Sequence, residues 1–97
     1  MESVRFVWDT RKNRLNQRKH GVSFEEAKTA FYDEHAKVYY DPDHSEDEDR
    51  FLLLGFSIRA RLLIVCHCYR ERELLIRIVS ARTADKAEAE AYSQDRK

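Results

Sequence analysis

Three observations predict an α+β protein that forms one domain over residues 1–97. The chain is long enough for one hydrophobic core and too short for two domains that each fold alone. Hydrophobic residues make up 42% of it, including five Phe, five Tyr and one Trp, which favours a packed core although 37% of the residues are charged. Two glycines and one proline are few for a sandwich or barrel with many tight turns, so we expect helices to contribute substantially.

The start of the chain predicts a strand and a helix. Val4, Phe6 and Trp8 alternate with Arg5 and Val7, the period-two pattern of a short strand. A helix is expected over about 10–20, with Asp9 or Thr10 as its N-cap and Gly21 as its C-terminal stop. Because this helix has one clear apolar anchor, most of its surface must face water or a polyanion.

A second helix is expected immediately afterwards. Ser23 and Glu26 have the spacing of a capping box, and Val22 and Ala27 are placed as a weak hydrophobic staple. We expect this helix to pack on the core and to end near Asp33.

The middle of the chain is rich in residues that favour strands. A first β-prone run at 36–40 precedes an acidic stretch that holds the only proline, and we expect a loop over 41–48. Short connectors separate the next runs, which predicts an antiparallel meander. Its strands are expected at 50–57, 61–69 and 74–80.

The end of the chain predicts a final helix. Thr83 is the expected N-cap of a segment rich in alanine and glutamate, and Arg96 and Lys97 suit the negative end of a helix dipole. The predicted order is therefore β, α, α, β, β, β, β, α. It implies an antiparallel sheet with helices on one or both faces.

Charge is segregated along the chain although the formal net charge is zero. The zero balance argues against indiscriminate binding to nucleic acid through a large basic field. Basic side chains dominate residues 1–20 and again 51–82, whereas 41–49 is strongly acidic. If the two basic segments meet in the fold, they form one basic surface.

Neither a metal nor a cofactor is expected. Cys66 and Cys68 share a face of one predicted strand, where backbone geometry disfavours a disulfide, so they are expected to be buried free thiols. Alternation directs His67 to the opposite face, so the three residues do not converge on a metal. The acidic stretch lacks the glycine and the spacing of a calcium-binding hand loop, so a solvated connector is the favoured interpretation.

A cytoplasmic location is expected. The N-terminal residues lack the long apolar stretch of a signal peptide, and the apolar run 62–68 is far shorter than the roughly 20 residues that span a bilayer.

Two histidines and two cations are candidates for chemistry in the first helix and the sheet. His67 and Arg77 interrupt apolar strands. A functional site and a solvent-facing position explain such interruptions equally well. Lys19 and His20 end the first helix, where a cation is favoured by the helix dipole without any catalytic role. His20 nevertheless suits proton transfer at a ribose hydroxyl, as does His67.

Further candidates surround the passage from the last strand to the last helix. Arg82 has a planar guanidinium that can bind phosphate oxygens in two places, and Ser80 and Tyr92 lie around the same passage. A cap or an ion pair with Glu88 explains the arginine equally well.

Three segments of the chain resemble the BrnT family of bacterial toxins. They read WDTRKNRLNQRKHGVSFEEAKTAF at 8–31, EDRFLLLGFS at 48–57 and RIVSARTADKAEAEAY at 77–92. The most distinctive parts are KHGVSFEEA at 19–27 and IRIVSAR at 76–82. The resemblance covers nearly the whole chain.

The resemblance implies a fold related to the RelE-like ribonuclease toxins and an endoribonuclease that cleaves RNA. It also implies a BrnA-type antitoxin as a protein partner, and a toxin homodimer within a heterotetramer that contains two antitoxins. Contacts with operator DNA are expected through the antitoxin only.

Polar residues in the matching segments carry the expected activity. Lys19, Arg50 and Ser80 are expected to contact RNA. For a metal-independent attack of the ribose 2′-hydroxyl on the adjacent phosphate, His67 or His20 is the expected base. Arg77 and Arg82 would stabilise the phosphorane, and Tyr92 is the candidate acid. The alternatives are noncatalytic: a module that docks a charged protein partner, or one that binds RNA without cleaving it.

Overall fold

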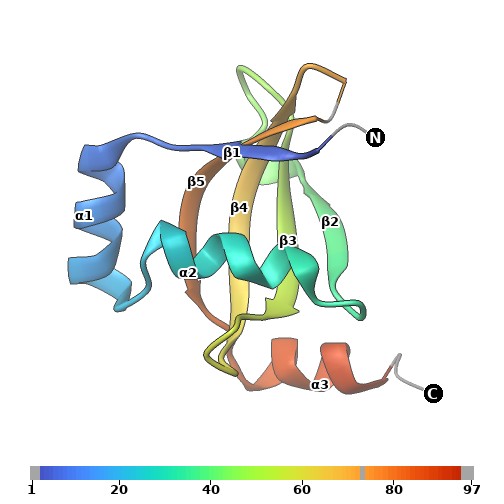
Figure 1. Ribbon diagram of the computed structural model, residues 1–97. Coiled ribbons are helices and arrows are strands. Elements are labelled where there is room, and N and C mark those ends of the chain that lie inside the picture. Colours follow the sequence, from blue (N-terminus) through green and yellow to red (C-terminus); the bar gives the residue numbers. More distant parts are fainter. Residues whose placement is uncertain (1–2, 73, 95–97) are drawn as a thin grey trace.

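A five-stranded sheet organises the protein (Figure 1). The computed structural model describes residues 3–72 and 74–94. Neighbouring strands follow the order β1-β5-β4-β3-β2. The strands are β1 Arg5–Val7, β2 Lys37–Asp41, β3 Arg50–Phe56, β4 Leu62–Arg70 and β5 Leu75–Thr83. The predicted α+β class and the predicted meander of 50–57, 61–69 and 74–80 are confirmed.

The sheet is mixed, which corrects the expectation of a fully antiparallel one. Strands β2 to β5 pair antiparallel, but β1 joins the edge of β5 in parallel, with Phe6 opposite Ile76. Parallel strands need a long crossover, and both N-terminal helices and the meander separate these two strands. Alternation over 4–8 identified β1 but carried no information about its partner.

Helices lie on both sides of the sheet. They are α1 Thr10–His20, α2 Phe24–Thr29 and α3 Lys86–Gln94, with short 3₁₀ turns η1 Ala30–Tyr32 and η2 Pro42–His44. The predicted bounds of α1 are confirmed, with Asp9 accepting from the Arg11 amide at 2.8 Å and Gly21 ending the helix at φ 70°. In Figure 1, α2 crosses in front of the sheet, α1 stands beside the edge near β5, and α3 lies at the far end of the strands. No described helix is long and apolar enough to span a membrane.

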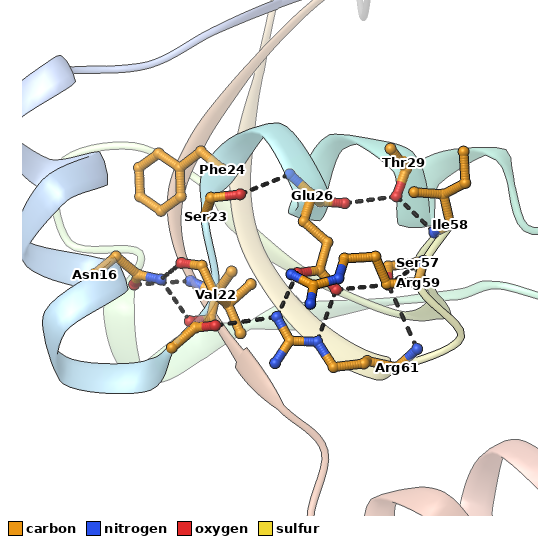
Figure 2. A network of polar contacts seen from close by, with 12 residues as sticks. Asn16, Val22, Ser23, Phe24, Glu26, Thr29, Ser57, Ile58, Arg59 and Arg61 are labelled. Atoms are coloured by element: carbon orange, nitrogen blue, oxygen red, sulfur yellow. Dashed lines mark hydrogen bonds and ion pairs between the residues drawn. The ribbon is translucent and has the colours of Figure 1, made fainter.

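The predicted capping box at the start of α2 is only half formed. Ser23 Oγ accepts from the Glu26 amide at 3.0 Å, as expected. The Glu26 carboxylate does not turn back to Ser23; it binds Arg61 and accepts from Ser57 Oγ at 2.7 Å (Figure 2). This network ties α2 to the β3–β4 turn, because a buried carboxylate must find donors.

Two separate apolar clusters cover the two faces of the sheet. Under α2, Phe24 and Ala27 pack on Leu53, Val65 and Ile78, all of them buried. On the opposite face α3 contributes a second, smaller cluster, which leaves the rest of that face for other contacts. Its buried members are Leu54, Ile64 and Tyr92.

The prediction of Thr83 as the N-cap of α3 is wrong. Strand β5 continues through Thr83, and the helix begins after Asp85. Asp85 Oδ1 accepts from the Glu88 amide and Glu88 Oε1 accepts from the Asp85 amide, each at 2.8 Å, which is a complete capping box. Arg96 and Lys97 lie outside the described residues.

Candidate functional site

A β-bulge in β5 determines which side chains lie on the open face of the sheet, the face opposite α2 that α3 covers only in part. Cys66 pairs with Ser80 but its neighbour His67 pairs with Ile78, so Val79 has no partner in β4. Strict alternation from Ile78 would have directed Ser80 into the core. The extra residue instead reverses the alternation, so that Ser80 and Arg82 face away from the core. Bulges often redirect side chains in this way beside functional sites.

The bulge therefore brings three predicted site residues onto one face. Arg77, Ser80 and Arg82 pair with Cys68, Cys66 and Ile64, which alternate along β4 and face the side that α3 partly covers. Sequence alternation places Arg77 and Ser80 on opposite faces, so it did not reveal this arrangement.

Two adjoining hollows of about 440 and 390 Å³ lie on this face. Both are lined by Asp43, His44 and Arg50, and we call the two hollows together the groove. His20, Ser80 and Arg82 line its larger part, and Arg77 lines its smaller part. The walls also include Asp41, Leu52, Ile64, Cys66 and Ala81 in the larger hollow and Glu46, Asp47 and Glu48 in the smaller one.

Arg82 is held in a defined position by Glu88. Its Nη1 and Nη2 donate to the two carboxylate oxygens at 2.8 Å each, and Nη1 also donates to the Thr83 carbonyl at 3.2 Å. The hydrogen bonds with Glu88 raise the pKa of Arg82 and lower that of Glu88. A guanidinium carries five N–H donors, so the Nε hydrogen and one Nη2 hydrogen are left without a hydrogen bond to the described part of the chain.

Arg50 is the central cation of the groove. It begins β3, is half-buried and lines both hollows. Among residues 3–72 and 74–94 no carboxylate forms an ion pair with it, whereas Glu48 binds Arg70 at 2.8 Å and Arg77 at 3.5 Å. An arginine without a carboxylate partner is the better placed one for an anionic ligand.

His20 reaches the groove because the end of α1 is fastened to β5. The side chain of Asn16 is buried, donates to the carbonyls of Val22 and Ala81 at 2.8 Å each, and accepts from the Ala81 amide at 3.1 Å. The half-buried His20 thereby lies on the same hollow as Ser80. Exposed Lys19 lines a smaller neighbouring hollow that also includes His20 and Ser80.

The structure does not place His67 in the groove. It is fully buried and pairs with Ile78 on the core face, where its ring meets Phe31 edge-on at 4.8 Å. Nδ1 lies 3.0 Å from the Val65 carbonyl, and burial lowers the pKa of the imidazole. An interior histidine explains the break in the apolar strand.

Tyr92 also lies outside the groove and makes its contacts in the interior. It is 3% exposed, its hydroxyl donates to Asp33 Oδ2 at 2.6 Å, and its ring meets Phe56 edge-on at 5.1 Å. These contacts fasten α3 to the sheet. Neither Tyr92 nor His67 therefore belongs to the site that the groove defines.

Sequence reasoning missed the pair Asp41 and His44, because it treated 41–48 as a solvated connector. Asp41 ends β2, and its Oδ2 lies 2.9 Å from His44 Nδ1. The signal was present as an Asp-Pro-x-His spacing, in which the proline starts a tight 3₁₀ turn.

The cysteines are buried free thiols, as predicted. Burial raises the pKa of both Cys66 and Cys68. Within the described part of the chain, no group of three or more His, Cys, Asp or Glu side chains is arranged to hold a metal ion.

The fold and the groove together define a class: an α+β protein whose open sheet face gathers arginines, imidazoles and carboxylates around one groove. Comparison with known families gives a match over residues 8–88 to the ribonuclease toxin BrnT of type II toxin-antitoxin systems. The chain belongs to this BrnT family.

A solved structure has the same fold. The crystal structure of the Brucella abortus ribonuclease toxin BrnT superimposes with a TM-score of 0.65 and 21% sequence identity, covering 87% of this chain and 100% of that one. No match was found among curated protein sequences.

Proposed function

We propose that this chain is an endoribonuclease that cleaves RNA by attack of a ribose 2′-hydroxyl on the adjacent phosphate, without a metal ion. One observation carries the proposal: Arg50, Arg82 and His20, from three separate elements, line one hollow on the open face of the sheet. The family's description as ribonuclease toxins supports the same substrate.

The reaction makes three demands on the site. Negative charge that develops on the phosphorane needs cations, which Arg50 and Arg82 supply, with Arg77 as a further cation in the adjoining hollow. A proton must leave the 2′-hydroxyl and another must reach the departing 5′-oxygen, and His20 is suited to one of these transfers. The products are a 2′,3′-cyclic phosphate and a 5′-hydroxyl.

RNA on either side of the scissile phosphate needs its own contacts. Ser80 has a hydroxyl donor at the groove wall, and Lys19 lies beside it at the end of α1. We assign both to substrate binding, since hydroxyls and lysines commonly bind phosphate oxygens in nucleic-acid complexes.

The proposal includes neutralisation by a protein antitoxin, as the family description implies. The partner would be of the BrnA type, in a heterotetramer with a toxin homodimer, located in the cytoplasm and binding operator DNA through the antitoxin. Cleavage that purified antitoxin abolishes would support this part of the proposal.

The test is cleavage of labelled RNA by the purified chain in excess chelator, with two variants that break the same ion pair. Arg82→Ala removes the groove cation, and Glu88→Ala keeps the cation but removes its partner together with the Glu88 half of the α3 capping box. We expect Arg82→Ala to lower the rate by about 10²- to 10³-fold, as for loss of one electrostatic stabiliser, and folded Glu88→Ala, which keeps the cation but not its anchor, to lose less.

Equal losses of rate that parallel equal losses of thermal stability would show that the ion pair matters only for the fold. RNA left intact by the parent, together with salt-dependent binding, would contradict the proposal in favour of a module that binds RNA without cleaving it.

A further inference from the structure

We propose that His44, oriented by Asp41, is the general base of this reaction and that His20 is its acid. The inference rests on the proposed function and adds a residue pair to it. It starts from the position of His44, which lines both hollows of the groove and shares the larger one with His20, Arg50 and Arg82.

The pair combines a buried carboxylate with an exposed imidazole. The side chain of Asp41 is 10% exposed and that of His44 is 67% exposed, and Oδ2 and Nδ1 lie 2.9 Å apart. A carboxylate that accepts from Nδ1–H fixes the neutral ring in the tautomer whose Nε2 carries a lone pair. Nε2 is then the atom that accepts a proton.

Backbone contacts hold the pair in place beside Arg50. Asp41 Oδ1 accepts from the Asp43 amide at 3.2 Å, and Ser45 Oγ both donates to the Asp41 carbonyl and accepts from the Arg50 amide at 2.9 Å. Asp41 and Arg50 are also register partners of β2 and β3. The same strand ends therefore position the base and the central cation.

The proton transfers balance with the two histidines in different protonation states. His44 Nε2 takes the proton of the 2′-hydroxyl as the O2′–P bond forms, and the P–O5′ bond breaks as protonated His20 gives its proton to O5′. His44 leaves the step protonated and His20 neutral, and exchange with water restores both. No oxidant or further reactant is needed.

A leaving-group substitution separates the two roles. In an RNA oligonucleotide with sulfur in place of the 5′-bridging oxygen, the thiolate departs without a proton, so an acid is no longer required. We expect His44→Gln to lose about 10²- to 10⁴-fold in rate on both the oxygen and the sulfur substrate. We expect His20→Gln to lose rate on the oxygen substrate and to recover it on the sulfur substrate.

Asp41 is a positioning residue, and a double variant tests that role. Asp41→Asn should be impaired, but Asp41→Asn combined with His44→Gln should be no slower than His44→Gln alone, because the carboxylate acts through the imidazole. A purely structural role of Asp41 would add a further loss. His35→Gln is the control, since His35 is exposed and does not line the groove.

Three outcomes would overturn the inference. A folded His44→Gln variant within about threefold of an active parent would remove His44 from catalysis. Recovery of His44→Gln on the sulfur substrate would make His44 the acid. A parent that cleaves neither substrate would instead contradict the proposed function on which the inference rests.

Discussion

Arg61 donates hydrogen bonds to the carboxylate of Glu26 from two nitrogens, Nε at 2.9 Å and Nη2 (Figure 2). The side chain of Glu26 is 5% exposed and that of Arg61 is 32% exposed. Arg61 Nη2 also donates to the Gly21 carbonyl at 3.0 Å. One side chain thus joins the α1–α2 corner, α2 and the β3–β4 turn.

Arg61→Met should therefore destabilise the fold strongly. It leaves a buried carboxylate with Ser57 and the more distant Arg59, which we expect to cost about 2–3 kcal/mol, less than a fully buried pair because Arg61 is partly solvated. Urea unfolding measures it. Arg5→Met is the matched control, because the exposed pair of Arg5 with Glu71 should contribute at most about 1 kcal/mol. Equal losses in both variants would contradict the role of the network.

The same pair predicts a loss of stability in acid. The hydrogen bond from Arg61 is the main cause that lowers the pKa of Glu26 below its ordinary 4.5. Because the folded pKa is the lower one, the stabilisation is complete above about pH 4.5 and is lost as pH falls through the folded value. Unfolding free energies between pH 6 and 3 should fall less steeply in Arg61→Met than in the parent. Parallel curves would contradict this prediction.

His67 should affect stability at a higher pH and should not affect cleavage. Burial lowers its pKa below the ordinary 6.5, so its neutral form is stable above about pH 6.5 and stability falls below that pH as the unfolded chain takes up a proton. His67→Gln, which keeps a donor for Val65, should flatten the fall in Tm between pH 6.5 and 5 and leave the cleavage rate near that of the parent. A large loss of cleavage by the folded variant would return His67 to the site.

Gly55 allows the 3₁₀ turn after α2 to approach the sheet. A Cβ built there would lie 2.9 Å from the Ala30 carbonyl oxygen and 3.1 Å from the Ala36 Cβ. Gly55→Ala should destabilise by about 1–3 kcal/mol, because overpacking forces the backbone to shift. Thermal unfolding checks it, and a Tm equal to that of the parent would contradict the close approach.

Lys19 should contribute to the salt dependence of RNA affinity. If it neutralises one phosphate, Lys19→Ala should reduce the slope of log affinity against log salt by about 0.7. Arg14→Ala is the control, since Arg14 is exposed on the same helix but does not line the hollow beside Ser80. The same change of slope in both variants would indicate a general charge effect instead of a specific contact.

The parts of the fold that were predictable are those set by local chemistry. Asp9 and Gly21 bound α1 as expected, since caps and left-handed stops depend on neighbouring residues. Pairing between distant segments was not predictable, which is why the parallel partner of β1 was missed. The start of α3 was misplaced because Thr83 and Asp85 are both suitable caps and the strand pairing of Thr83 with Leu63 prevailed.

The candidate site was predictable in part. Arg50, Ser80, Arg82 and His20 meet in one hollow, although they were singled out by separate arguments. The unpaired Val79 decides that Ser80 and Arg82 share a face with Arg77, and no pattern in the strand sequence marks that bulge. His67 was singled out because a polar ring in an apolar strand is costly to bury without a partner, and the Val65 carbonyl supplies that partner in the core.

If the groove cleaves RNA with the substrate's own 2′-hydroxyl, the chemical groups at the fragment ends are fixed by that attack and can be mapped. The purified chain and its Arg50→Gln variant would be incubated with RNA in excess chelator and both ends of every fragment mapped. We expect 2′,3′-cyclic phosphates and 5′-hydroxyls from the parent, formed about 10²- to 10³-fold faster than by the variant. Fragments with 5′-phosphates, or equal cleavage by the two proteins, would contradict it.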